Sequence, residues 1–80
     1  MQIKVFVTLK EGVLDPQGKA IEHSLHSLGF GGVSGVRMGK YLEFQFDGAD
    51  PDQAKHQTEQ MCEKLLANTV IEDYRFEIQE

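Results

Sequence analysis

The stretch QIKVFVTLK, residues 2–10, decides the fold class of this chain. Its apolar residues stand at every second position: Ile3, Val5, Val7 and Leu9. A period of two predicts a β-strand that buries one face and leaves the other in water. Phe6 places a large ring among the polar residues of the second face, so that face is a candidate contact surface for another subunit.

Two helices are predicted after this strand, because Asp15-Pro16 and Asp50-Pro51 each place a capping side chain before a proline suited to the first helical position. Gly29 is expected to end the first helix, and Asn68 the second. The first helix has an apolar stripe and a polar face expected to meet water: Ile21, Leu25 and Leu28 form the stripe, and Lys19, Glu22, His23, His26 and Ser27 point outward. The second helix has a longer inner stripe: Ala54, Thr58, Met61, Cys62, Leu65 and Leu66.

Three further strands complete the pattern. A short strand is expected at residues 36–38, then a hairpin turn at Gly39-Lys40, then strands at residues 41–47 and about 70–78. The order βαββαβ predicts an α+β domain related to the ferredoxin-like fold, with an antiparallel sheet and both helices on one face. An uncovered sheet face or open sheet edges favour dimerisation through that surface or those edges.

Composition limits the function. The chain has 80 residues, of which 40% are hydrophobic, and this suits a single domain spanning residues 1–80. Thirteen acidic against eight basic residues give a net charge of −5, so we expect neither nucleic acid nor a membrane surface as a partner. With one cysteine and no long apolar run, we expect a cytoplasmic protein without disulfides, signal peptide or membrane span.

The glycine motifs do not have the spacing that nucleotide binding requires. Five residues separate Gly12 from Gly18-Lys19 where a phosphate-binding loop needs four, and Ala20 replaces the magnesium-binding Ser or Thr. In the glycine-rich residues 29–35, Ser34 stands where a dinucleotide-binding motif needs glycine.

The remaining reactive side chains do not predict a catalytic site. Cys62 lies on the inner stripe beside Glu59 and Glu63, which raise a thiol pKa, so we interpret it as a packing residue. His23 and His26 are spaced to reach one metal ion, although no third ligand is evident. The alternative function is therefore a stand-alone ferredoxin-like sensor that binds a metabolite or a metal ion.

Three stretches carry a resemblance to a known family: VTLKEGVLDPQGKA at residues 7–20, VRMGKY at 36–41 and MCEKLLAN at 61–68. Together they resemble the small S subunit of phosphoribosylformylglycinamidine synthase, over essentially the whole chain. Thr69 stands where the family commonly has proline, and residues 31–35 hold more glycine than usual. Both departures fall in connections, where they alter local stiffness.

The resemblance implies a non-catalytic subunit of the complex that makes formylglycinamidine ribonucleotide from formylglycinamide ribonucleotide, ATP and glutamine in purine biosynthesis. In this family a glutaminase subunit releases ammonia and a large synthetase subunit uses ATP. The S subunit, as a homodimer or higher oligomer, bridges them and assists ammonia transfer. The resemblance implies no cofactor in this chain, with ATP and magnesium held by the synthetase subunit. The implied docking residues are matched to the family: Lys10, Glu11, Gly12, Asp15, Gln17, Lys19, Arg37, Gly39 and Lys40.

Overall fold

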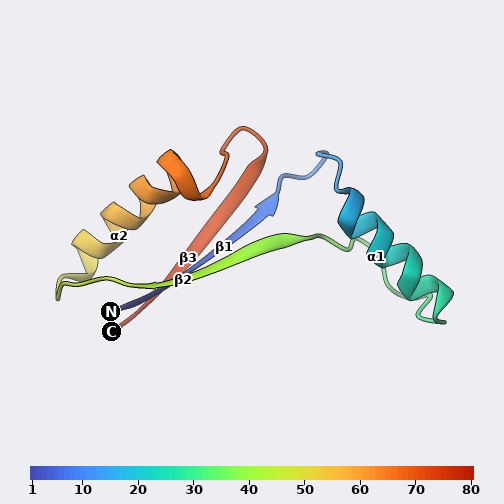
Figure 1. Ribbon diagram of the computed structural model, residues 1–80, viewed down its shortest axis with the longest axis horizontal. Coiled ribbons are helices and arrows are strands. Elements are labelled where there is room, and N and C mark those ends of the chain that lie inside the picture. Colours follow the sequence, from blue (N-terminus) through green and yellow to red (C-terminus); the bar gives the residue numbers. More distant parts are fainter.

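The computed structural model describes residues 1–80 and contains one antiparallel sheet of three strands: β1 (Gln2–Leu9), β2 (Gly39–Gln45) and β3 (Glu72–Gln79). The strand order is β2-β1-β3, so the alternating stretch that begins the chain lies in the middle of the sheet (Figure 1). Val5 at its centre stands opposite Leu42 on β2 and Phe76 on β3. Such cross-strand pairs stabilise a sheet.

The helix α2 (Pro51–Met61) covers one face of this sheet (Figure 1). Asp50 caps it, because the Asp50 side chain accepts a hydrogen bond of 3.0 Å from the Asp52 amide. The fully buried side chains between helix and sheet come from β1, α2 and the turn after α2: Ile3, Val5, Val7, Ala54, Thr58 and Cys62. The predicted strand, the predicted helix and their contact are confirmed.

A π-helical segment, η1 (Cys62–Leu66), follows α2 and widens the last turn. The Ala67 amide donates a hydrogen bond of 3.0 Å to the Cys62 carbonyl oxygen, five residues back. The wider turn changes the direction of the side chains after Met61, and Leu65 is 82% exposed. The prediction that Leu65 faces inward is wrong, because it assumed a regular α-helical period.

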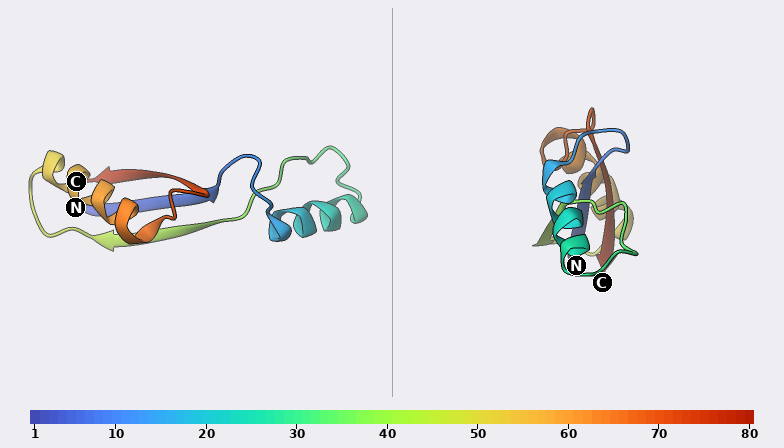
Figure 2. Two further views of the ribbon diagram at one scale, coloured as in Figure 1. Left: turned by 90° about the horizontal axis from the view of Figure 1, so that it is seen from above. Right: turned by 90° about the vertical axis from the view of Figure 1, so that its right-hand side faces the viewer.

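The helix α1 (Pro16–Ser27) projects from the sheet instead of lying on it. Figures 1 and 2 show α1 and the return segment, residues 28–38, reaching beyond the end of the sheet; we call residues 16–38 the arm. The longest dimension is 49 Å, and the radius of gyration is 15.9 Å against about 12 Å for a compact chain of this length. The expectation that both helices cover one face is corrected: within this chain α2 alone covers it. No helix is long and apolar enough to cross a membrane.

The return segment does not form a strand of the sheet. The Val36 amide donates to Glu22 Oε1 at 3.1 Å, and the Met38 amide donates to Asp15 Oδ2 at 2.8 Å. The two carboxylates therefore occupy amides that a neighbouring strand would otherwise use. The strand predicted at residues 36–38 is absent for this reason, whereas the antiparallel α+β architecture is confirmed.

β2 begins earlier than predicted. Gly39 stands opposite Thr8 and Lys40 stands opposite Val7, so both residues pair with β1. The predicted hairpin turn at these two residues is therefore wrong. No turn forms there, because the chain passes from the arm directly into β2 (Figure 2).

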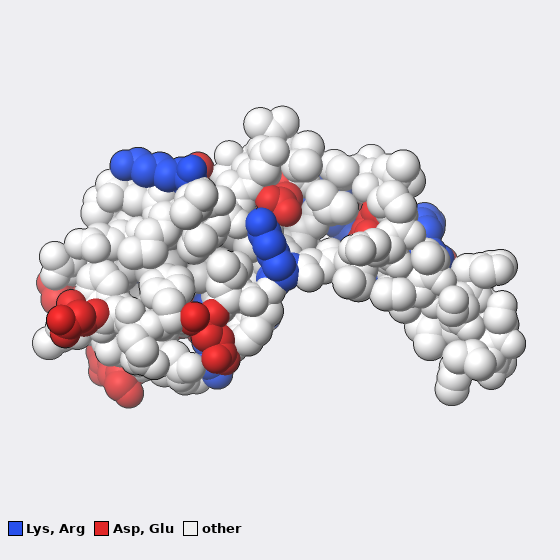
Figure 3. Space-filling view, in the orientation of Figure 1, with Lys and Arg blue, Asp and Glu red and all other residues white.

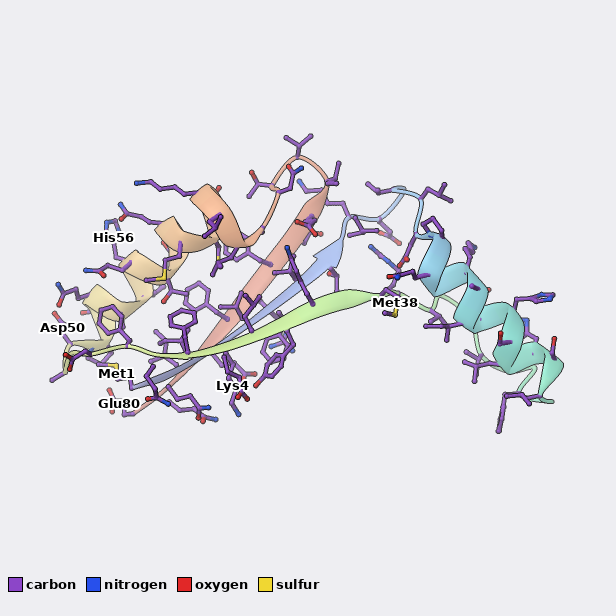
Figure 4. All side chains as sticks on the ribbon, viewed as in Figure 1. Met1, Lys4, Met38, Asp50, His56 and Glu80 are labelled. Carbon is purple, nitrogen blue, oxygen red and sulfur yellow. The ribbon has the colours of Figure 1, made fainter.

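The face of the sheet away from α2 is open to solvent. The Arg75 guanidinium carbon lies 3.9 Å from the centre of the Phe6 ring, and the ring centres of Phe6 and Tyr41 are 5.0 Å apart. Lys4 points away from α2 on this side (Figure 4). The ring that interrupts the polar pattern of β1 is thus the centre of an aromatic and cationic patch.

Candidate partner-docking site at the base of the arm

A shallow cavity of about 340 Å³ opens where the arm joins the sheet, and we call it the junction cavity. Met38 lies at this place, between β2 and α1 (Figure 4). The lining residues come from β1, the start of α1, the end of the return segment, β2 and β3: Val7, Leu9, Asp15, Pro16, Gln17, Met38, Gly39, Lys40 and Glu72. Residues far apart in the sequence therefore meet here.

Asp15 holds the junction together. It is 8% exposed, and its two carboxylate oxygens accept hydrogen bonds from the Gly18 amide at 2.9 Å and the Met38 amide at 2.8 Å. These two amides, with Met38 first, lower the pKa of Asp15 below its usual value, and the nearby Arg37 lowers it further. The sequence predicts the helix cap but gives no sign of the bond to Met38.

Two glycines allow the close packing at the junction. A Cβ on Gly18 would lie 2.5 Å from the Val36 carbonyl oxygen and 2.7 Å from Asp15 Oδ2. A Cβ on Gly39 would overlap the Val7 carbonyl oxygen. Gly39 therefore has a structural reason to be glycine. Sequence reasoning missed the role of Gly18, although a glycine inside a helix often marks a close contact.

The predicted docking residues divide into two groups. Four of them line the junction cavity: Asp15, Gln17, Gly39 and Lys40. The other five lie outside its lining, in the turn after β1 or on the arm: Lys10, Glu11, Gly12, Lys19 and Arg37. Asp15 and Gly39 already have roles inside the chain. Gln17, Lys19, Arg37 and Lys40 are exposed and free to meet another protein.

The turn before the junction is fixed by backbone geometry. The Lys10 amide donates to the Ile71 carbonyl oxygen at 2.8 Å, and the Val13 amide donates back to the Lys10 carbonyl oxygen at 3.1 Å. Gly12 has a φ of 85°, which favours glycine. On the far side of the cavity, Lys40 Nζ lies 4.0 Å from Glu72 Oε1.

Four residues of the polar face of α1 are exposed as predicted, namely Lys19, His23, His26 and Ser27, whereas Glu22 turns toward the return segment. Glu22 is half-buried, and its bond to the Val36 amide is the main reason that its pKa lies below the usual value. His26 Nε2 lies 2.6 Å from the Val33 carbonyl oxygen. Asp15 and Glu22 are seven residues apart, two helical turns on one face, so this spacing is the signal that could have revealed the contact.

The structure shows the surroundings of the two candidate reactive sites, the α1 histidines and the Cys62 thiol. His26 is bonded to the return segment, and no group of three or more His, Cys, Asp or Glu side chains could hold a metal ion. The Cys62 thiol is fully buried, and its pKa is raised by burial first and by Glu63 and Glu59 second. A buried thiol with a raised pKa is inert, which agrees with the packing role predicted for Cys62.

Comparison with known proteins identifies the family. A family model described as PurS, phosphoribosylformylglycinamidine (FGAM) synthase, matches residues 2–80. The chain belongs to the PurS family. Its alignment with the PurS subunit of FGAM synthase from Bacillus subtilis strain 168 has 54% identity over 79 residues and covers 99% of this chain and 93% of that protein.

Solved structures of PurS proteins share the whole fold, including the arm. The crystal structure of Methanocaldococcus jannaschii PurS, a subunit of formylglycinamide ribonucleotide amidotransferase in the purine biosynthetic pathway, matches with a TM-score of 0.86 and 37% identity. That match covers 99% of this chain and 95% of the other. A chain in the structure of PurLQS from Thermotoga maritima matches with a TM-score of 0.86 and 28% identity, covering 95% and 93%.

These matches confirm the family assignment that the sequence resemblance predicted. Membership of the PurS family makes this chain an accessory subunit of FGAM synthase in purine biosynthesis. The alternative of a stand-alone sensor has no such support.

Proposed function

We propose that this PurS-family chain couples the glutaminase subunit of FGAM synthase to its large synthetase subunit and assists the transfer of ammonia between them. The observation that carries the proposal is the match over nearly the whole chain with a protein in the structure of PurLQS from Thermotoga maritima. An elongated molecule with an arm, an open sheet face and a junction cavity can present several surfaces to several partners (Figure 2).

The chemistry explains why such a subunit is needed. Ammonia that escapes into water at neutral pH becomes ammonium, which has no lone pair for attack on the activated amide. A sheltered route between two active sites keeps the nucleophile unprotonated. In this proposal the synthetase subunit holds ATP and magnesium and carries out the ligation, the glutaminase subunit hydrolyses glutamine, and this chain contributes geometry alone. Such a complex works in the cytoplasm.

The base of the arm is the proposed docking surface. Its exposed side chains are those free to meet a partner: Gln17, Lys19, Arg37 and Lys40, with Lys10, Glu11 and Gly12 in the turn beside them. Asp15 and Gly39 shape this surface from within. A cationic set at the rim of an acidic protein suits an acidic patch on the partner.

The docking proposal is tested by reversing one charge. Arg37→Glu is expected to weaken binding to the partner subunits about tenfold in calorimetry while the protein stays folded, because Arg37 is exposed and its attraction to Asp15 is a smaller effect than the two amide hydrogen bonds that hold this carboxylate. Lys55→Glu makes the same charge change at an exposed position of α2 and serves as the matched control. Equal binding by the Arg37→Glu and Lys55→Glu variants would remove the base of the arm as the docking surface.

The proposed working form is a homodimer or a higher homo-oligomer. The single chain buries only nine of its 80 residues, and it leaves both the open sheet face and the arm uncovered. Such surfaces are typical of a protomer rather than of a monomeric protein.

A further inference from the structure

Two connections beside the junction carry exposed apolar side chains. Leu14, in the connection between β1 and α1, is 75% exposed. Val70 and Ile71, in the turn before β3, are 81% and 39% exposed. Turns that lie in water usually hold Gly, Pro, Asn, Asp or Ser. Large apolar side chains at such positions indicate a contact surface, and we call these three side chains the ridge.

Hydrogen bonds within the turn before β3 hold its part of the ridge in place. The Ile71 and Glu72 amides donate to the Asn68 carbonyl oxygen at 3.0 Å and 2.7 Å. The Val70 amide donates to Asn68 Oδ1 at 3.2 Å, and the Asn68 amide donates to Glu72 Oε1 at 2.6 Å. The turn therefore satisfies its own polar groups while the Val70 side chain stays in water. A side chain held on a fixed backbone loses little conformational entropy when it binds a partner.

The two connections form one surface. The Lys10 amide donates to the Ile71 carbonyl oxygen at 2.8 Å and so joins them. Figures 1 and 2 show both connections at the same edge of the molecule, and in Figure 3 the turn before β3 is an uncharged protrusion at this edge. Glu72, which closes the turn, also lines the junction cavity. The ridge is therefore continuous with the proposed docking surface.

Cations border the ridge. Lys10 lies in the first connection, and Lys40 Nζ lies 4.0 Å from Glu72 Oε1 beside the second. With Lys19 and Arg37 on the arm, these side chains are half of the eight basic residues of a chain whose net charge is −5. An apolar centre with a charged rim is the usual anatomy of a protein interface. The cationic rim fits a partner surface with carboxylates around its apolar part.

The same rim argues against a second copy of this chain as the partner. A two-fold axis through the ridge would bring the same patch of both copies together, so Lys10 and Lys40 of one copy would face the cations of the other. Like charges that meet in an interface oppose association. A different subunit, with carboxylates at the matching places, has no such penalty.

We infer that the ridge is the apolar centre of the docking surface, and that Leu14 and Val70 enter an apolar socket bordered by carboxylates on a partner subunit of FGAM synthase. The inference rests on the proposed function and names the side chains that anchor the contact. Val70 is the main anchor, because it is the most exposed of the three and its turn is fixed by hydrogen bonds. Lys10 and Lys40 then pair with the carboxylates around the socket.

Calorimetry with the purified glutaminase and synthetase subunits, titrated separately, tests the anchor. Val70→Asp should weaken binding to the subunit that carries the socket about tenfold, because it replaces an apolar contact by a charge. Leu14→Asp should weaken binding to the same subunit, whereas Val70→Ile keeps the apolar side chain and should bind like the wild type. Ser34→Asp adds the same charge at an exposed position of the return segment and is the matched control.

Two results would overturn the inference. One is wild-type binding of both subunits by the Val70→Asp and Leu14→Asp proteins. The other is loss of self-association by Val70→Asp in sedimentation experiments, which would assign the ridge to a contact between copies of this chain. Wild-type self-association together with weakened subunit binding is the expected result.

Glutamine-driven synthesis separates this inference from the proposed function. The Val70→Asp protein should restore the same maximal rate as the wild type, but only at about tenfold higher concentration. A wild-type concentration dependence would overturn the role of the ridge and leave the coupling function intact. If the wild-type protein itself restores no glutamine-driven rate, the proposed function fails instead.

Discussion

Gly18→Ala tests the close packing between α1 and its return segment. The added Cβ would lie 2.5 Å from the Val36 carbonyl oxygen, whereas ordinary contacts begin at 3.4 Å. The return segment must therefore retreat by about 0.9 Å. The Val36 amide, already 3.1 Å from Glu22 Oε1, then moves out of hydrogen-bonding distance.

Two opposing effects set the magnitude. Alanine is favoured over glycine inside a helix by about 1 kcal/mol. Overpacking of a tight contact costs about 1–3 kcal/mol. With the middle of the overpacking range, the two effects leave a net loss of about 1 kcal/mol in the free energy of local opening of the arm. This loss makes opening about fivefold more frequent.

Amide hydrogen exchange measured residue by residue is the appropriate assay, because it reports opening of the arm separately from unfolding of the sheet. Exchange at Val36 and Met38 should accelerate about fivefold, while the amide of Val5 in the core strand is unchanged. Gly32→Ala is the matched control, because a Cβ there meets nothing within 4 Å. Unchanged protection of Val36 and Met38 in the Gly18→Ala protein would refute the packing argument.

Three other predictions follow from buried groups. Val5→Ala should destabilise the protein by about 2–3 kcal/mol in urea titration, because Val5 is fully buried in the middle of the sheet; a loss below 1 kcal/mol would contradict its central role. Asp15 has a lowered pKa, so its stabilisation is complete above its usual value of 3.8 and is lost as the pH falls further. Protection of the Met38 amide should decrease below about pH 4 in the wild-type protein, whereas Asp15→Asn should show low protection already at pH 7 and little pH dependence; identical pH profiles would contradict this role. Cys62 should react with iodoacetamide at pH 7.5 only after unfolding in urea, because its thiol is buried and its pKa is raised; rapid labelling of the folded protein would contradict the packing role.

The sequence predicts those parts of the fold that depend on local patterns. The alternation around Val5 gives the central strand, and the Asp50-Pro51 cap gives the start of α2. The central strand and α2 pack against each other within the chain, so the apolar pattern of each element is enough to predict which side is buried. Leu65 is exposed, contrary to the prediction, because the π-helical turn of η1 breaks the α-helical period of about 3.6 residues on which the prediction depends.

The arm could not be predicted, for a physical reason. The stripe of Ile21 and Leu28 shows that something covers α1, but periodicity does not reveal which surface or which chain supplies the cover. The bond from the Met38 amide to Asp15 joins residues 23 positions apart, and neither residue type requires it. Only four of the nine predicted docking residues line the junction cavity. The resemblance to the family points to all nine residues, but it does not show which of them stabilise the fold and which contact a partner.

The central claim is that this chain couples two active sites and performs no chemistry itself. The most direct measurement is formylglycinamidine ribonucleotide production by the purified synthetase and glutaminase subunits, with and without this protein, using glutamine in one series and an ammonium salt in the other. We predict that the protein restores the glutamine-driven rate and leaves the ammonium-driven rate unchanged. If neither rate responds, or if both rise equally, the coupling account is contradicted.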